Sequence, residues 1–135
     1  MQIFLFCLFI AGITVVDQWT KWLVVENIPL YGHVDAIPGL FHFTYTQNTG
    51  AAFSSFDGMR WLFVLIFLVF AVAMILELVT KRFGLTKFEH WCLVAILGGG
   101  LGNMIDRVFL GEVIDFLSFI FWGYEFYVFV GYALK

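Results

Sequence analysis

Five polar residues, Asn103, Asp106, Arg107, Glu112 and Asp115, lie in a segment that is otherwise apolar, and the carboxyl groups among them could do acid–base chemistry. Asp106 and Arg107 follow Asn103 by three and four residues, so on a helix the three side chains project from one face. Asp115 has apolar neighbours on both sides along the chain. Burial among them would raise the pKa of its carboxyl, and a second carboxylate nearby would raise it further. Such a group can hold a proton near neutral pH and then release it, as a general acid or base must.

Asp106 and Arg107 also have a second interpretation, as an ion pair that anchors a helix end at the lipid headgroups. An ionisable residue inside a membrane span is a candidate functional residue by default, because burying its charge is costly. In both interpretations we expect Arg107 to be the partner of Asp106. The sequence leaves the two open.

The composition is that of an integral membrane protein. Hydrophobic residues make up 62% of the chain and charged residues 13%, against about 45–50% and about 25% in soluble domains. The net charge of −3 argues against a nucleic-acid partner. Cys7 and Cys92 lie in apolar runs without His or Cys at ligand spacing, so we expect no disulfide framework, metal site or other cofactor.

Three apolar segments are long enough to cross a bilayer, and we expect helices at about 3–24, 61–79 and 88–108. The first segment also resembles the core of a secretory signal peptide. It lacks the positive leader and the cleavage site, so a retained helix is favoured. Gly98 and Gly102 in the third segment have the spacing that lets helix backbones approach closely.

The segments outside these helices complete one expected membrane domain, residues 1–135. Residues 26–59 contain helix breakers and an alternating aromatic stretch at 40–47, so we expect a small extramembrane β-sheet there. Residues 111–135 form a C-terminal arm, whose part from 116 onward is either interfacial or the start of a fourth span. The expected fold is therefore an all-α membrane protein, a three-helix bundle with a small sheet between the first two helices.

The orientation follows from the basic residues of one short loop. Lys81, Arg82 and Lys87 follow the second span, and such clusters remain on the cytoplasmic side. We therefore expect the N-terminus inside, and residues 26–59 and Asp115 at the outer surface.

Four motifs in order along the chain resemble those of the lipoprotein signal peptidases, also called type II signal peptidases. The resemblance covers about residues 10–126. The matching stretches are DQWTKW at 17–22, an Asn-x-Gly-x-Ala-Phe motif with Asn48, Gly50, Ala52 and Phe53 in place, GNMIDR at 102–107 and GEVIDF at 111–116.

The resemblance implies an intramembrane aspartic protease of the bacterial cytoplasmic (inner) membrane, with its active site at the outer surface. This family removes the signal peptide of prolipoproteins just before a cysteine that already carries a diacylglyceryl group. Two carboxylates activate a water, with no metal and no covalent intermediate. The implied partners are prolipoprotein signal peptides with a lipidated Cys and membrane lipid.

The resemblance also implies roles for individual residues. Asp115 corresponds to one catalytic aspartate, and Asn48 and Gly50 to contacts with the substrate backbone. Asn48 has a second interpretation as a turn residue. The supporting polar cluster corresponds to Asp17, Asn103, Asp106 and Arg107. Asp17 and Lys21 lie one helical turn apart and could form a plain ion pair, whereas the resemblance favours a role for them in placing the site.

The resemblance ends near residue 129. The family's second catalytic aspartate begins a fourth helix in an Asn-x-Ala-Asp motif, whereas residues 130–135 contain neither Asn nor Asp. We therefore expect a truncated or frame-shifted member, or a degenerate paralogue. Asp106 is a poor substitute for the missing aspartate, because an adjacent guanidinium favours its charged form. The 135 residues are thus expected to be inactive, and the alternative function is to bind lipidated signal peptides without cleaving them.

Overall fold

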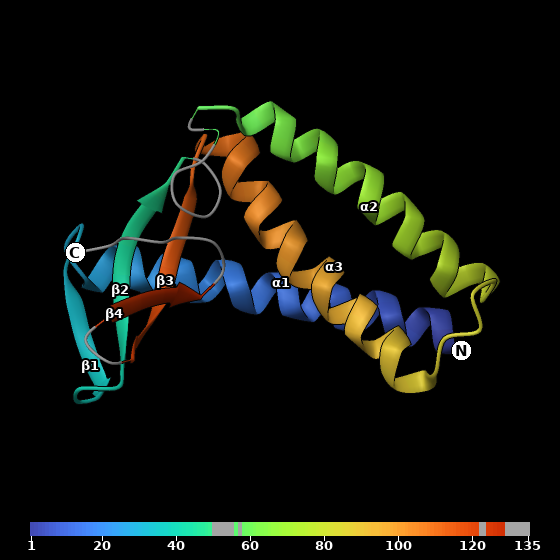
Figure 1. Cartoon of the computed structure of the whole chain (residues 1–135), viewed down its shortest axis with the longest axis horizontal. Helices are drawn as coiled ribbons and strands as arrows, with labels where there is room; N and C mark the ends of the chain where they lie inside the picture. The colour runs from blue at the N-terminus through green and yellow to red at the C-terminus, as the bar shows by residue number, and fades with distance from the viewer. Residues whose placement is uncertain (50–55, 57, 122–123, 129–135) are drawn as a thin grey trace.

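Three long helices and a four-stranded sheet make up the computed structural model, which describes residues 1–49, 56, 58–121 and 124–128 (Figure 1). Side chains are described as far as residue 119. The sheet lies at one end of the helices (Figure 1). In chain order the elements are α1 (Gln2–Asn27), β1 (His33–Ile37), β2 (Phe41–Asn48), α2 (Arg60–Thr80), α3 (Lys87–Phe109), β3 (Val113–Phe121) and β4 (Tyr124–Val128).

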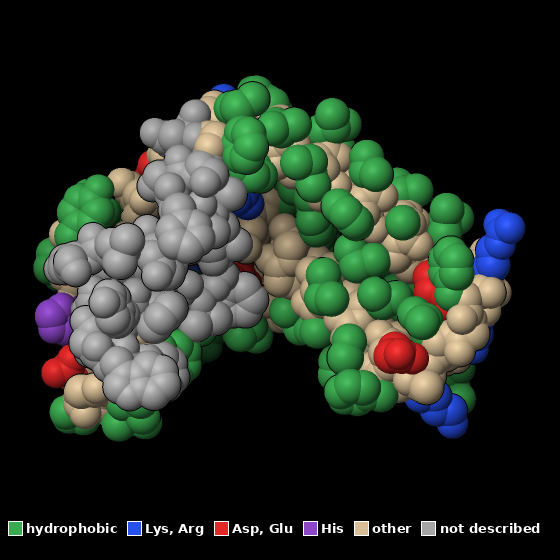
Figure 2. Space-filling view, viewed as in Figure 1, with side chains coloured by type: hydrophobic (Ala, Val, Ile, Leu, Met, Phe, Trp, Pro, Cys, Tyr) green, Lys and Arg blue, Asp and Glu red, His purple; other side chains and the backbone are tan. Residues whose placement is uncertain are grey.

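All three helices are long and apolar enough to cross a membrane, as the sequence predicted. They have 26, 21 and 23 residues, and at about 1.5 Å per residue each spans about 30 Å or more. Apolar side chains cover the visible surface of α2, and Lys and Arg side chains gather at the helix ends opposite the sheet (Figure 2). This surface suits a lipid environment along its middle and a headgroup region at that end.

Local signals fix where α3 begins and where α2 ends. Thr86 and Glu89 form a reciprocal capping box, in which each side chain accepts from the other's backbone N–H. The C-cap of helix α2 is Lys81, which has a left-handed backbone conformation and donates its N–H to the Glu77 carbonyl. Gly84, three residues later, also has a positive φ. The chain therefore reverses between the two helices within a short loop.

Two glycines of α3 let α1 approach it closely, and this confirms the prediction from their spacing. A Cβ on Gly98 would lie 2.7 Å from Cβ of Ile13, and one on Gly102 would collide with the Asp17 carboxylate. Thr14 Oγ1 donates to the Gly98 carbonyl at 3.0 Å across the same contact. Small residues and interhelical hydrogen bonds of this kind hold helices together in lipid, where no hydrophobic effect drives association.

The sheet is antiparallel with the strand order β1-β2-β3-β4. The expected sheet between the first two helices is present as β1 and β2, and β2 matches the predicted strand at 40–47. The C-terminal segment, left open between an arm and a fourth span, contributes β3 and β4 in its described part. The stretch that forms β3 has no apolar–polar alternation to identify a strand, and its residues 113–116 are buried on both faces.

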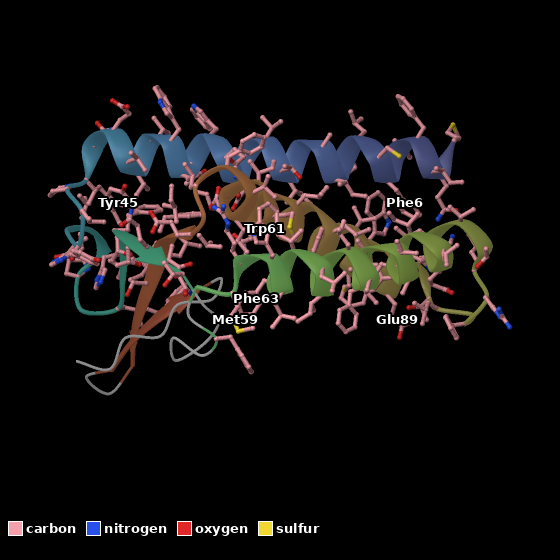
Figure 3. All side chains as sticks on the ribbon, turned by 90° about the horizontal axis from the view of Figure 1, so that it is seen from above. Phe6, Tyr45, Met59, Trp61, Phe63 and Glu89 are labelled. Atoms are coloured by element: carbon pink, nitrogen blue, oxygen red, sulfur yellow. The ribbon has the colours of Figure 1, made fainter. Side chains whose placement is uncertain are left out.

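Two clusters of buried apolar side chains fix the helices and the sheet. One lies among the helices around Phe6, and the other joins the end of α1 to the sheet; Figure 3 labels Phe6 in the first cluster and Tyr45 at the second, toward opposite ends of the molecule. The second cluster packs β2 and β3 against the end of α1. Its members are Val24, Ile28 and Phe116, with Phe43, Tyr45 and Leu117 packed against them.

Candidate active site

A buried lysine lies at the centre of the polar cluster where α1 meets α3. Lys21 is 3% exposed, and its Nζ lies 2.8 Å from Oδ2 of Asp17 and 2.8 Å from Oδ2 of Asp106. The same ammonium donates to Oδ1 of Asn103 at 2.9 Å. Its three donors therefore all have acceptors, as a buried ammonium requires.

Asp106 connects three elements through its carboxylate. Oδ1 accepts from Gln18 Nε2 at 3.0 Å, and Oδ2 accepts from the backbone N–H of Ile114 at 3.1 Å in addition to Lys21. Gln18 also donates to the Gly102 carbonyl at 3.0 Å. The carboxylate thus ties α1 and α3 to the first residues of β3, next to Asp115.

Asp115 has the surroundings that the sequence predicted. It pairs with Thr46 of β2, is 1% exposed, and its Oδ1 has no hydrogen-bond donor within the described part of the chain. Burial raises the pKa of its carboxyl from 3.8 to about 7; the charges of Lys21 and Arg107 act against this rise, and Asp106 adds to it. This side chain can therefore change its protonation state near neutral pH.

Arg107 lies on the other side of the cluster. Its guanidinium lies over the ring of Phe63 on α2, 5.0 Å from the centroid, and its charge acts on both Asp115 and Asp106. We expected Arg107 to be the partner of Asp106, whereas Asp106 makes its 2.8 Å ion pair with Lys21 of α1. Consecutive helical residues point about 100° apart, so Asp106 reaches α1 while Arg107 reaches α2.

Of the two residues assigned to substrate contacts, the structure describes one. Asn48 ends β2, is buried, and stands opposite Val113. It lies two residues from Thr46, the partner of Asp115, and residues two apart on a strand face the same side. Gly50 lies outside the described residues.

The structure therefore brings Asp17, Asn103 and Asp106 together with Lys21, which the sequence named only as the helical neighbour of Asp17, and adds Gln18, which was not predicted. Lys21 and Gln18 lie in the same turn as Asp17, and an ammonium within an apolar helix was a signal for Lys21. Their contacts with α3 depend on how the helices pack, and no local sequence pattern predicts them. In the described ranges no group of three or more His, Cys, Asp or Glu side chains is arranged to hold a metal ion.

Comparison with known proteins identifies the family. The family model described as "Signal peptidase (SPase) II" matches residues 9–130. The chain belongs to the signal peptidase II family. It is therefore related by descent to proteases, and its three spans make it a multi-pass protein of the bacterial inner membrane.

Individual relatives agree with this assignment. The lipoprotein signal peptidase of Symbiobacterium thermophilum is 42% identical over 112 residues, 83% of this chain and 73% of the relative. That of Bacillus pumilus is 41% identical over 113 residues, 84% of this chain and 72% of the relative. Two solved bacterial membrane enzyme structures superpose with TM-scores of 0.78 and 0.77 at 25% and 26% identity. The first superposition covers 98% of this chain and 85% of the solved chain, and the second covers 88% of this chain and 72% of the solved chain.

Proposed function

We propose that this chain has the active-site architecture that cleaves the signal peptide of prolipoproteins just before a diacylglyceryl-modified cysteine. The observation that carries the proposal is Asp115, a fully buried carboxyl whose pKa is raised to about 7 within a signal peptidase II fold. An aspartic mechanism needs two carboxyls in different protonation states around one water. Asp115 is suited to be one of them.

The position of Asp115 also supports this substrate. Asp115 belongs to β3, which contacts α1 and α3 and lies with the sheet at one end of the membrane spans (Figure 1). A lipid-anchored cysteine holds the adjacent peptide bond at the membrane surface, which is the same depth. In the proposal Asn48 and Gly50 contact the substrate backbone, and Asp17, Asn103, Asp106 and Arg107 support the site.

The second carboxylate is the part of the reaction that the 135 residues do not supply. Residues 116–135 contain Glu125 and no aspartate. Asp106 is unsuited to the role, because both of its oxygens already accept from Lys21, Gln18 and the backbone of Ile114, which leaves little room for a shared water. We therefore propose that the 135 residues by themselves do not cleave prolipoproteins. The second candidate function, binding a lipidated signal peptide without cleavage, follows from the same arrangement.

Complementation tests the proposed reaction. The chain is expressed in cells depleted of their own lipoprotein signal peptidase, and a prolipoprotein is followed on a gel. We expect no mature form from the 135 residues. We expect maturation from a chimera that joins residues 1–128 to the C-terminal segment of the Bacillus pumilus relative.

Two variants of that chimera assign the chemistry. Asp115→Asn should abolish maturation at an unchanged membrane level, because an amide keeps the shape but cannot exchange the proton. Glu112→Gln, in the same segment, should mature the substrate normally. Maturation by the unmodified 135-residue chain, lost on Asp115→Asn, would contradict the proposed need for a second aspartate.

The proposed orientation puts the sheet on the outer side and the loop after α2 in the cytoplasm. Two single-cysteine chains test it, with the native Cys7 and Cys92 replaced by serine. A cysteine at His33 should react with a membrane-impermeant thiol reagent in intact cells, and one at Phe83 should react only after lysis. Both native side chains are well exposed, at 58% and 77%. Labelling of Phe83→Cys in intact cells would show the opposite orientation.

A further inference from the structure

Lys21 is the least exposed cation of the site, and the proposed reaction gives it no role. Around it the site gathers three carboxylates, Asp17, Asp106 and Asp115, against two cations, Lys21 and Arg107. Asp17 and Asp106 each make a 2.8 Å ion pair with Lys21. Asp115 is the carboxylate without such a pair among the described contacts, so it is the one that a proton can neutralise.

The geometry connects Lys21 to Asp115 through one carboxylate oxygen. Oδ2 of Asp106 contacts Nζ of Lys21 and also accepts the backbone N–H of Ile114, the residue before Asp115. The Lys21 ammonium thereby fixes the Asp106 oxygen that accepts the hydrogen bond from the Ile114 backbone. Removing the ammonium would free the Asp106 carboxylate to move, and β3 would lose its fixed point beside the site.

Lys21 also acts on Asp115 directly through its charge. The charged groups that act on Asp115 are Lys21 of α1 and Arg107 and Asp106 of α3, and Lys21 has the largest effect of the three. Asp17 shares the same ammonium. Both the position and the charge of the proposed catalytic carboxyl therefore depend on one side chain of α1.

We propose that Lys21 is a positioning residue for Asp115: its ammonium fixes Asp106 against the Ile114 backbone and balances the charge around the Asp115 carboxyl. This inference rests on the proposed role of Asp115 in the reaction. It predicts opposite effects for the two ends of the Lys21–Asp17 ion pair. Loss of the cation favours a protonated Asp115, and loss of the Asp17 charge favours an ionised one.

The test is a pH titration of Asp115 in the whole 135-residue chain. The chain is labelled with ¹³C at the aspartate carboxyls, placed in detergent micelles and followed by NMR between pH 4 and 10. Asp115→Asn identifies the signal. The parent should titrate near pH 7, Lys21→Met higher by about one pKa unit or more, and Asp17→Asn lower. Lys21→Arg, which keeps the charge, should stay within about half a unit of the parent.

A second readout follows the backbone. Exchange of the Ile114 amide should become several-fold faster in Lys21→Met and remain near the parent rate in Lys21→Arg. An unchanged Asp115 titration in folded Lys21→Met would overturn the proposal. If Lys21→Met does not fold, Lys21→Gln, which keeps a donor to Asp106 without the charge, decides, and an unshifted titration there overturns it equally.

These measurements need no cleavage of a substrate. An absent shift therefore contradicts the positioning role of Lys21 alone. A chimera that fails to mature prolipoproteins contradicts the proposed function instead, so the two failures are distinguishable.

Discussion

Replacing Asp115 by asparagine should stabilise the folded chain at alkaline pH and leave it nearly unchanged at acid pH. In the folded protein burial raises the pKa of this carboxyl to about 7, whereas in the unfolded chain it returns to its ordinary 3.8. Between these values the folded state binds a proton that the unfolded state does not. The stability of the parent therefore falls as pH rises, from its full value below about pH 4 to its lowest above about pH 7.

The size of the effect follows from the same two values. The pKa difference of about 3, at about 1.4 kcal/mol for each pKa unit, corresponds to about 4 kcal/mol lost from the parent by pH 8. Asparagine resembles the protonated acid at every pH and avoids this loss. The variant should therefore match the parent within about 1 kcal/mol at pH 4.5, and exceed it by about 2–4 kcal/mol at pH 8.

The assay is unfolding of the purified chain in mixed micelles, followed by far-UV circular dichroism at pH 4.5 and pH 8. Taking the difference between variant and parent at each pH cancels the other titrating groups. Glu26→Gln, an exposed carboxyl on α1, is the matched control and should show a difference independent of pH. If Asp115→Asn shows the same difference at both pH values, Asp115 is not a buried carboxyl of raised pKa, and the reasoning is wrong.

Two further substitutions test the packing around the site, with the same unfolding assay. Asp106→Asn should destabilise the chain by about 1–3 kcal/mol, because an amide cannot accept from all three donors and the buried ammonium keeps only Asp17 as a charged partner; a loss no larger than that of Glu26→Gln would contradict the central place of this carboxylate. Gly102→Ala should cost about 1–3 kcal/mol, since its Cβ would collide with the Asp17 carboxylate. Gly12→Ala has nothing within 4 Å and should be neutral or slightly stabilising, so equal effects of the two alanines would refute the close helix contact.

Several features of this protein are local, and the sequence was sufficient to predict them. The three spans depend on length and hydropathy, which are properties of one segment at a time. The close approach at Gly98 and Gly102 follows from a spacing of four within one helix. The apolar neighbours of Asp115 along the chain suggested that its carboxyl is buried and its pKa raised, although adjacent residues of a strand face opposite sides and the fold had to bury both faces.

The strands of the C-terminal segment were not predictable in the same way. The apolar stretch of β3 has no apolar–polar period, since residues 113–116 are buried on both faces, and its assignment as a strand depends on pairing with β2. Thr46 and Asp115 meet across 69 residues of chain. The catalytic role of Asp115 and the substrate contact of Asn48 remain predictions.

The arrangement of charges around the site was decided by the tertiary structure alone. Sequence proximity paired Asp106 with Arg107, while the fold brought to Asp106 an ammonium from α1 and an amide donor from Gln18, which lies 88 residues away. The residue types and their spacing determined which side chains were costly to bury. The crossing of α1 and α3 decides which cation pairs with which carboxylate. Burial removes water as an alternative partner, so each charged group can pair only with the groups that packing places within about 3 Å.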